Sequence, residues 1–102
     1  MREGVLQSQV VQTLKVMGIF FLRLNSGVVR VRGGMMHLCP TGTADVLVLN
    51  KSGSPTWLEL KQLKGDQRVR QKEFQTMVQG MGHAYHIIRS MDDLLPLIEG
   101  MR

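Results

Sequence analysis

Two acidic side chains and one lysine occur where two consecutive strands are expected, and together they could hold a divalent cation. Asp45 opens the apolar run 45–49, and Glu59 and Lys61 are two residues apart in the run 56–61. Side chains two residues apart on a strand leave the same face, so Glu59 and Lys61 point the same way. A short turn separates the two runs, which favours adjacent strands on which the three charged groups converge.

Two carboxylates this close require a cation between them. At about 4 Å they repel by about 4 kcal/mol at an effective dielectric constant of about 20, and a lysine offsets only part of that. Mg²⁺, or Mn²⁺, fits because it accepts carboxylate oxygens and keeps several waters for a phosphate substrate. The ion would polarise a phosphate oxygen and lower the pKa of a bound water. Lys61 would orient or deprotonate that water, or stabilise the charge that develops on phosphorus.

The elements that position these groups begin with a helix predicted over residues 3–17, ending before Gly18. Its apolar stripe consists of Leu6, Val10, Leu14 and Met17. Glu3 falls on the same stripe. Its carboxylate would either point toward the sheet or act as a first-turn acid that the helix dipole favours.

Strands are predicted from β-branched and aromatic runs bounded by turn residues. They cover 19–25, 28–32, 35–38, 45–49, 56–61 and 83–89. Gly33-Gly34 would join the second and third of these as a hairpin, and 45–49 reads as a strand buried on both faces. Arg30 and Arg32 share one face of the hairpin. That pair either grips a phosphate backbone or forms a solvated face.

A second helix is predicted over 68–81, followed by Gly82 past its end. Its apolar stripe consists of Phe74, Met77, Val78 and Met81. Gln71 lies on the flank of that stripe, where a buried amide needs a partner; it would either line the site or point into solvent. A terminal helix over 91–99 has Ser90 as its N-cap.

Length and composition indicate one globular domain over residues 1–102. The longest near-apolar stretch, 16–22, is too short to cross a membrane, and no signal peptide is apparent, so a cytoplasmic protein is expected. Cys39 is the only cysteine, which excludes an internal disulfide and a cysteine-based zinc site. The net charge of +5 suits a polyanionic partner.

Other metal-ligand and partner patterns have simpler explanations. His83 and His86 lie three residues apart on an expected strand and therefore face opposite sides; with His37 they are interpreted as structural. Several of the eight methionines lie on apolar stripes, where core filling explains them. Glu59-Leu60-Lys61 alone could equally be a surface ion pair between strands, and it is the surrounding pattern that favours catalysis.

That pattern resembles the VRR-NUC domain, the virus-type replication and repair nuclease module of the PD-(D/E)xK nuclease superfamily. The matching residues are Glu3, the segments 23–27, 42–45 and 59–61, Gln71 within 70–74, Gly82 and the strand 83–89. The resemblance covers almost the whole chain. It implies an α/β fold with a restriction-endonuclease-like core, the element order α-β-β-β-β-α-β-α, and a mixed central sheet flanked by helices.

The resemblance also implies roles for individual residues. Asp45, Glu59 and the backbone carbonyl of Leu60 would be metal ligands, Lys61 would be catalytic, and Gln71 would line the site. Glu3 is a further candidate ligand, with Gln7, one turn later, as its substitute. Ala44 stands where the family has proline, which any small residue can replace in the turn.

The implied activity is that of a Mg²⁺- or Mn²⁺-dependent endonuclease, a hydrolase that cuts phosphodiester bonds in structured DNA. Stand-alone members from viruses, including phages, and bacteria are associated with homodimers that cleave four-way (Holliday) junctions in replication, recombination and repair. DNA contacts are expected from Asn25, Arg30, Arg32 and Lys64. The alternatives are a restriction-like or archaeal-resolvase-like nuclease with another DNA substrate, and a non-catalytic DNA-binding module.

Overall fold

The computed structural model describes residues 3–24, 28–51 and 53–102, and of residues 3, 28, 29 and 37 the backbone alone. The elements are α1 (Glu3–Val16), β1 (Phe21–Arg23), β2 (Val28–Val31), β3 (Gly34–His37), β4 (Val46–Leu49), β5 (Pro55–Leu60), α2 (Val69–Gly80), β6 (Ala84–Ile88), α3 (Met91–Leu94), the 3-10 turn η1 (Leu95–Leu97) and α4 (Ile98–Met101). The mixed α/β class is confirmed. Five strands precede α2, matching the five predicted runs; the element order implied by the resemblance has one strand fewer.

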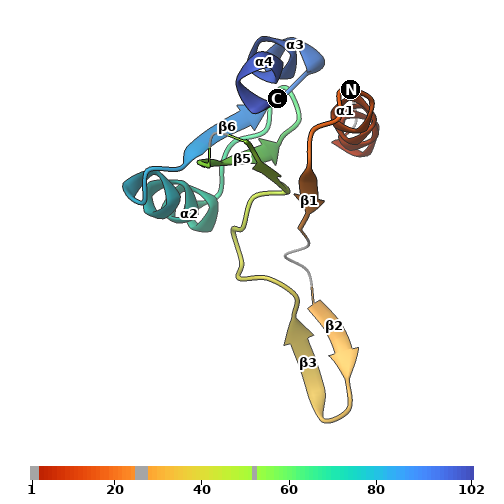
Figure 1. Cartoon of the computed structure of the whole chain (residues 1–102). Helices are drawn as coiled ribbons and strands as arrows, with labels where there is room; N and C mark the ends of the chain where they lie inside the picture. The colour runs from red at the N-terminus through yellow and green to blue at the C-terminus, as the bar shows by residue number, and fades with distance from the viewer. Residues whose placement is uncertain (1–2, 25–27, 52) are drawn as a thin grey trace.

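The central sheet has the strand order β1-β4-β5-β6 and is mixed, as expected. β1 and β5 both run antiparallel to β4, whereas β5 and β6 are parallel. A parallel pair needs a crossover connection, and α2 supplies it. β2 and β3 form a separate two-stranded ribbon that projects away from the sheet (Figure 1).

Alternation along the strands divides the apolar side chains between two faces of the sheet. The larger cluster joins α1, α3 and α4 to the sheet and includes Leu6, Val10, Leu14, Val46, Val48, Leu58, Leu60, Ile88, Leu94 and Ile98. The smaller one lies under α2 and consists of Ala44, Val78 and Tyr85, with Trp57, Phe74 and Ile87 packed against it. The face under α2 is therefore the one with less apolar packing.

Two expectations about burial are wrong. Leu49 is 43% exposed, so β4 is not buried on both faces; α2 packs over β5 and β6 and leaves the outer part of β4 uncovered. Met77 and Met81 are 51% and 61% exposed. The inward side of α2 instead carries Val78, with Phe74 half-buried, because the helix is turned so that its glutamine-bearing flank meets the sheet.

The hairpin differs from expectation by one residue. Val31 pairs with Gly34, so Arg32 and Gly33 form the turn, and Gly33 supplies the positive φ of 92°. Arg32 therefore lies in the turn and does not share a strand face with Arg30. Met35 and Met36 are exposed on the ribbon. Of the methionines on the predicted apolar stripes, Met17 packs against the core as expected, whereas Met77 and Met81 do not.

The helix ends follow from local chemistry. The predicted end of α2 is confirmed: Gly82 adopts φ 86°, and the N–H of His83 donates to the Val78 carbonyl at 3.0 Å, as in a glycine-terminated helix. The expected single helix over 91–99 is three short pieces, since Pro96 has no amide hydrogen to continue the ladder. Ser90 occupies the N-cap position of α3 without a side-chain capping bond.

No helix within the described ranges is long and apolar enough to cross a bilayer. The longest, α1, has 14 residues, against about 20 for a membrane span.

Candidate active site

Asp45 is bonded to β5 on both sides of Glu59. The Asp45 N–H donates to the Leu58 carbonyl at 3.1 Å, and Asp45 Oδ2 accepts the Leu60 N–H at 2.7 Å. The carboxylate thus takes the place of the backbone acceptor that a continued strand ladder would supply. Because a strand residue presents its N–H and C=O on one edge, the Leu60 carbonyl lies on the Asp45 side of β5.

Glu59 is almost completely enclosed, with 1% of its surface exposed. Its Oε1 accepts a hydrogen bond from the Tyr85 hydroxyl. Its Oε2 is buried, and no hydrogen-bond partner for it occurs among the described residues. An oxygen of this kind is costly to keep in a protein interior unless it has a ligand.

Tyr85 is itself held by Gln67, which is held in turn by Gln75. Gln67 Nε2 donates to the Tyr85 hydroxyl oxygen at 3.2 Å and to Gln75 Oε1 at 2.9 Å. Burial, followed by the hydrogen bond to Glu59 and its charge, raises the pKa of Tyr85 above the usual value of about 10. The phenol therefore stays protonated and acts as a donor to Glu59.

Lys61 directly follows the last residue of β5 and is half-buried. Its N–H donates to the Ile88 carbonyl at 3.0 Å, so its backbone is anchored to β6. The ion pairs that residues 3–24, 28–51 and 53–102 form are Arg70–Glu73 and Arg102–Glu99. Lys61 takes part in neither pair, so its ammonium charge is available to another partner.

The loop after Lys61 is fixed by one arginine. Arg89 Nη1 donates to the carbonyls of Gln62 at 2.8 Å and Leu63 at 3.4 Å, and also to that of Gly65. The Lys61 side chain lies beside this loop, since a Cβ on Gly65 would be 3.7 Å from Lys61 Cδ. Arg89 therefore fixes the loop against which the Lys61 side chain lies.

The turn before Asp45 is fitted against α2. Thr43 closes it by bonding to the Pro40 carbonyl through both its N–H, at 3.1 Å, and its hydroxyl, at 2.6 Å. Gly42 has φ 92°, and a Cβ there would lie 2.4 Å from the Arg70 carbonyl oxygen. Only glycine permits this approach, so the turn and the start of α2 fix each other and set the position of Asp45.

Comparison with known proteins identifies the fold. No family model and no curated protein matches the sequence. A solved structure described as "VRR_NUC domain" superposes with a TM-score of 0.69 and 18% sequence identity, covering 98% of this chain and 97% of that chain. This chain has the VRR-NUC fold. The resemblance seen in the sequence and the expected fold class are thus confirmed.

Within the VRR-NUC fold, Asp45 directly precedes β4 and its carboxylate accepts the Leu60 N–H next to Glu59, while Lys61 directly follows β5; their joint role as a site stays a prediction. Gln71 lies in the first turn of α2, half-buried, and its Oε1 accepts the Arg68 N–H at 2.8 Å. This bond caps the helix. The Gln71 amide oxygen is therefore engaged at the helix N-terminus, and its part in catalysis stays a prediction.

The candidate residues of α1 are less directly placed. Glu3 begins α1, but its side chain lies outside the described part of the structure, and α1 packs on the face of the sheet opposite Glu59. Gln7 lines a small hollow with Arg23, between α1 and β1. Glu3 remains a prediction, and Gln7 is directed toward β1.

The predicted DNA contacts lie in two places. Arg30 and Arg32 are exposed on the projecting ribbon, remote from β5 (Figure 1). Lys64 is exposed on the loop that Arg89 holds, close to Lys61 in the chain. Asn25 lies outside the described residues.

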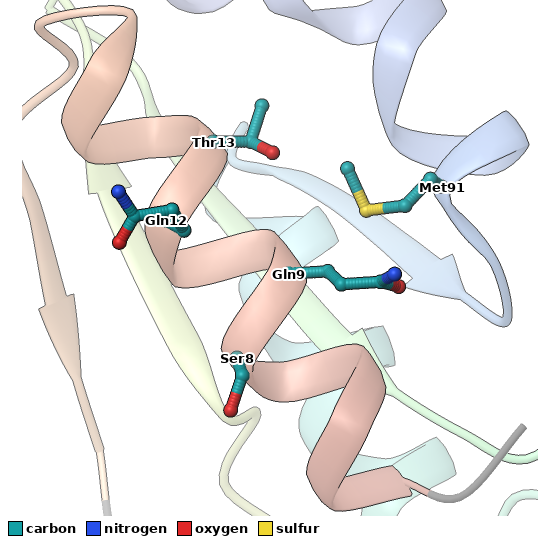
Figure 2. Close-up of a pocket in the computed structure, with 5 residues that line it drawn as sticks. All are labelled: Ser8, Gln9, Gln12, Thr13 and Met91. Atoms are coloured by element: carbon teal, nitrogen blue, oxygen red, sulfur yellow. The ribbon is translucent and has the colours of Figure 1, made fainter.

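The remaining polar features belong to the framework. His83 Nδ1 accepts the Trp57 Nε1–H at 3.0 Å, and His86, on the opposite face, has its pKa lowered by burial. A shallow groove between α1 and α3 is lined by Ser8, Gln9, Gln12, Thr13 and Met91 (Figure 2). Its lining has no ionisable side chain, so the acid–lysine cluster, and not this groove, is the candidate site.

The donor set can be tested against a metal. Clusters of three or more His, Cys, Asp or Glu side chains do not occur among the described residues, so protein ligation falls to Asp45, Glu59 and the Leu60 carbonyl. All are hard oxygens, which Mg²⁺ and Mn²⁺ prefer. Glu59 Oε2, buried and without a hydrogen-bond partner among the described residues, supplies a position that a cation would fill, and the residues fit such an ion.

Three residues of this site were missed in the sequence: Tyr85, Gln67 and Arg89. For Tyr85 a signal existed, since a tyrosine on a buried strand normally finds a partner for its hydroxyl. Gln67 and Arg89 carried no signal of their own, because both act on backbone or side-chain atoms far away in the chain.

Proposed function

We propose that this VRR-NUC fold carries a metal-dependent endonuclease that hydrolyses DNA phosphodiester bonds, with Mg²⁺ or Mn²⁺ held by Asp45, Glu59 and the Leu60 carbonyl. The observation that carries the proposal is Glu59: a carboxylate 1% exposed, beside a second acid, with an oxygen that no described residue satisfies. Removing a carboxylate from water costs several kcal/mol unless it is compensated. A bound cation compensates it.

Each residue then has a defined task. Bound at this site, the ion would polarise a phosphate oxygen and lower the pKa of a water. Asp45, just before β4, and Glu59, near the end of β5, would hold it, and the bond from the Leu60 N–H keeps the Asp45 carboxylate in place. Lys61 directs its ammonium toward the phosphate, where it orients the attacking water or stabilises the charge that develops on phosphorus.

The charge distribution supports DNA as the substrate. Residues 4–44 contain four Lys or Arg and no Asp or Glu, and the ribbon β2–β3 lies within this segment. A two-stranded ribbon fits the major groove of duplex DNA. We infer that Arg30 and Arg32 contact DNA at a distance from the cut, while Lys64 contacts it near Lys61.

Branched DNA, such as a four-way junction, is the proposed substrate, and the proposed active form is a homodimer. Two copies would bring two sites to one junction and cut two strands in a paired manner. Val31 and Met36, apolar side chains exposed on the ribbon face opposite Arg30, offer surface for such an assembly. Light scattering at working concentration measures its mass, and a monomer would count against the dimer.

A cleavage assay tests the function. Labelled four-way junction, flap and linear duplex are incubated with the protein in Mg²⁺, in Mn²⁺ and in EDTA. Cutting is expected with either ion and is expected to stop in EDTA; cutting that persists in EDTA contradicts the metal mechanism. Preference for linear duplex would favour a restriction-like substrate class, and binding without cutting a DNA-binding module.

Lys61→Ala separates catalysis from binding. The variant is expected to bind the junction as the wild type does, because it loses one of 13 Lys and Arg side chains, yet to lose cleavage. An active Lys61→Ala would remove the lysine from the mechanism.

A further inference from the structure

We propose that Tyr85 is a positioning residue that leaves Glu59 a single oxygen, Oε2, for the metal, and so makes the site prefer Mg²⁺ and Mn²⁺ over Ca²⁺. The inference rests on the metal site proposed above. Of the two carboxylate oxygens of Glu59, one accepts a hydrogen bond from Tyr85 and the other is left for the metal.

The hydrogen bonds around Tyr85 form a chain of donors that leads from Gln67 through Tyr85 to Glu59. Gln67 uses both hydrogens of its amide group, toward Gln75 Oε1 at 2.9 Å and toward the Tyr85 hydroxyl oxygen at 3.2 Å. Since the phenol oxygen already accepts from Gln67, its single hydrogen is directed to Glu59 Oε1. Oε1 is therefore occupied, while Oε2 has no partner within the described structure.

The arrangement is held from several elements. Tyr85 is 6% exposed, and its ring packs against Phe74 of α2 with the ring centroids 6.3 Å apart. Tyr85 pairs with Trp57 and lies two residues before Ile87, the partner of Glu59, so it is on the same face as Glu59. Gln75 belongs to α2 and Gln67 to the loop before it. The phenol cannot turn away without displacing this packing.

Carboxylate denticity distinguishes the ions. Ca²⁺ accepts six to eight oxygens and readily takes both oxygens of one carboxylate, whereas Mg²⁺ requires near-ideal octahedral geometry. With Oε1 committed to Tyr85, Glu59 offers one oxygen, which suits the smaller ion. Replacing Tyr85 by phenylalanine removes the hydroxyl, keeps the ring, and opens Oε1 to the metal.

The test measures metal binding by the full chain without DNA. Thermal unfolding is followed while MgCl₂, MnCl₂ or CaCl₂ is titrated, and the apparent affinity is taken from the rise in Tm. Partners of metal ligands typically change affinity by about 10–100-fold. For Tyr85→Phe we expect the ratio of Mg²⁺ to Ca²⁺ affinity to fall by about tenfold. Gln67→Met should shift it the same way by less, because the phenol hydrogen loses its imposed direction.

Two control variants make the result specific. Trp57→Phe removes an aromatic N–H whose partner is His83, on the same face as Glu59, but it leaves the groups that form the Gln67–Tyr85–Glu59 hydrogen bonds in place. It is expected to lower Tm while the ion ratio stays as in the wild type. Glu59→Gln should remove the metal-induced rise in Tm, which shows that the titration reports this site.

The titrations distinguish failure of the proposed metal site from failure of the positioning role of Tyr85. A wild-type protein that none of the three ions stabilises overturns the proposed metal site, and the inference with it. A wild type that is stabilised, with the same ion ratio in Tyr85→Phe and Gln67→Met, overturns the positioning role alone. If Tyr85→Phe does not fold, Gln67→Met decides.

Discussion

Asp45 holds the strand on both sides of Glu59, through its N–H to the Leu58 carbonyl at 3.1 Å and through Oδ2 to the Leu60 N–H at 2.7 Å. One side chain thus serves both as a candidate metal ligand and as the acceptor that ends a strand ladder. The two tasks can be separated by substitution.

Asp45→Asn and Asp45→Ala should differ in stability. The asparagine oxygen can still accept the Leu60 N–H, whereas alanine leaves that donor unsatisfied, at a cost of about 1–3 kcal/mol. Urea unfolding in EDTA should show this loss in Asp45→Ala and little change in Asp45→Asn, with cleavage abolished in both. Equal stabilities would contradict the structural task of the carboxylate.

Glu59→Gln should raise stability in EDTA while it abolishes cleavage. The glutamine keeps an oxygen for the Tyr85 hydroxyl and removes a buried charge that has one unpartnered oxygen. A gain of about 1 kcal/mol or more is expected, since residues at functional sites often sacrifice stability. The measurement is Tm in EDTA; a lower Tm than in the wild type would argue against a strained apo site.

Arg89→Gln should reduce cleavage without weakening the metal-induced rise in Tm. The substitution removes the donor that holds the carbonyls of Gln62 and Leu63, and Lys61 then loses the loop beside it. A displacement of about 1 Å can cost about 100-fold in rate, so a fall in kcat of about 10–100-fold is expected. Arg102→Gln, which loses only an exposed ion pair with Glu99, is the control. Equal activities of the two variants would refute the role.

Gly42→Ala should destabilise the protein more than Gly53→Ala. The two glycines have similar φ values, 92° and 96°, but only a Cβ on Gly42 meets the Arg70 backbone, whereas a Cβ on Gly53 meets nothing within 4 Å. Overpacking costs about 1–3 kcal/mol beyond the backbone strain that both share. Urea unfolding of the pair measures the difference, and similar losses would show that the close approach is unimportant.

His86 should make the protein less stable as the pH falls. Burial lowers its pKa in the folded state, so near the usual histidine pKa of about 6.5 the unfolded chain takes up a proton that the folded chain resists. The contribution is present above that pH and is lost below it. Between pH 7.5 and 5.5 the wild type should lose more stability than His86→Gln; equal losses would contradict the assignment.

Much of the site could be predicted because strand alternation is a local rule. Asp45, Glu59 and Lys61 follow from two short apolar runs and the turn between them. The structure pairs the two strands as expected and joins the Asp45 carboxylate to the Leu60 N–H, whereas the role of Lys61 stays a prediction. The end of α2 was equally local, since Gly82 terminates it.

The features that could not be predicted depend on how helices and strands distant in the sequence pack against each other. Tyr85 reaches Glu59 only because α2 carries the chain across to make β6 parallel to β5, and that register is invisible in the sequence. Met77 and Met81 have the spacing of a buried stripe, yet the rotation of α2 about its axis exposes them. Arg32 lies in the hairpin turn because the strand pairing is shifted by one residue.

The division of β5 between two faces has a consequence for the tolerance of the chain to mutation. Thr56, Leu58 and Leu60 are buried, with the two leucines in the larger apolar cluster, whereas Trp57 and Glu59 belong to the face under α2. In a saturation library, even-numbered positions of this strand should yield mostly aggregated protein. Position 59 should yield soluble but inactive protein. Substitutions at even-numbered positions would thus reduce solubility, whereas substitutions at Glu59 would reduce activity, along one and the same strand.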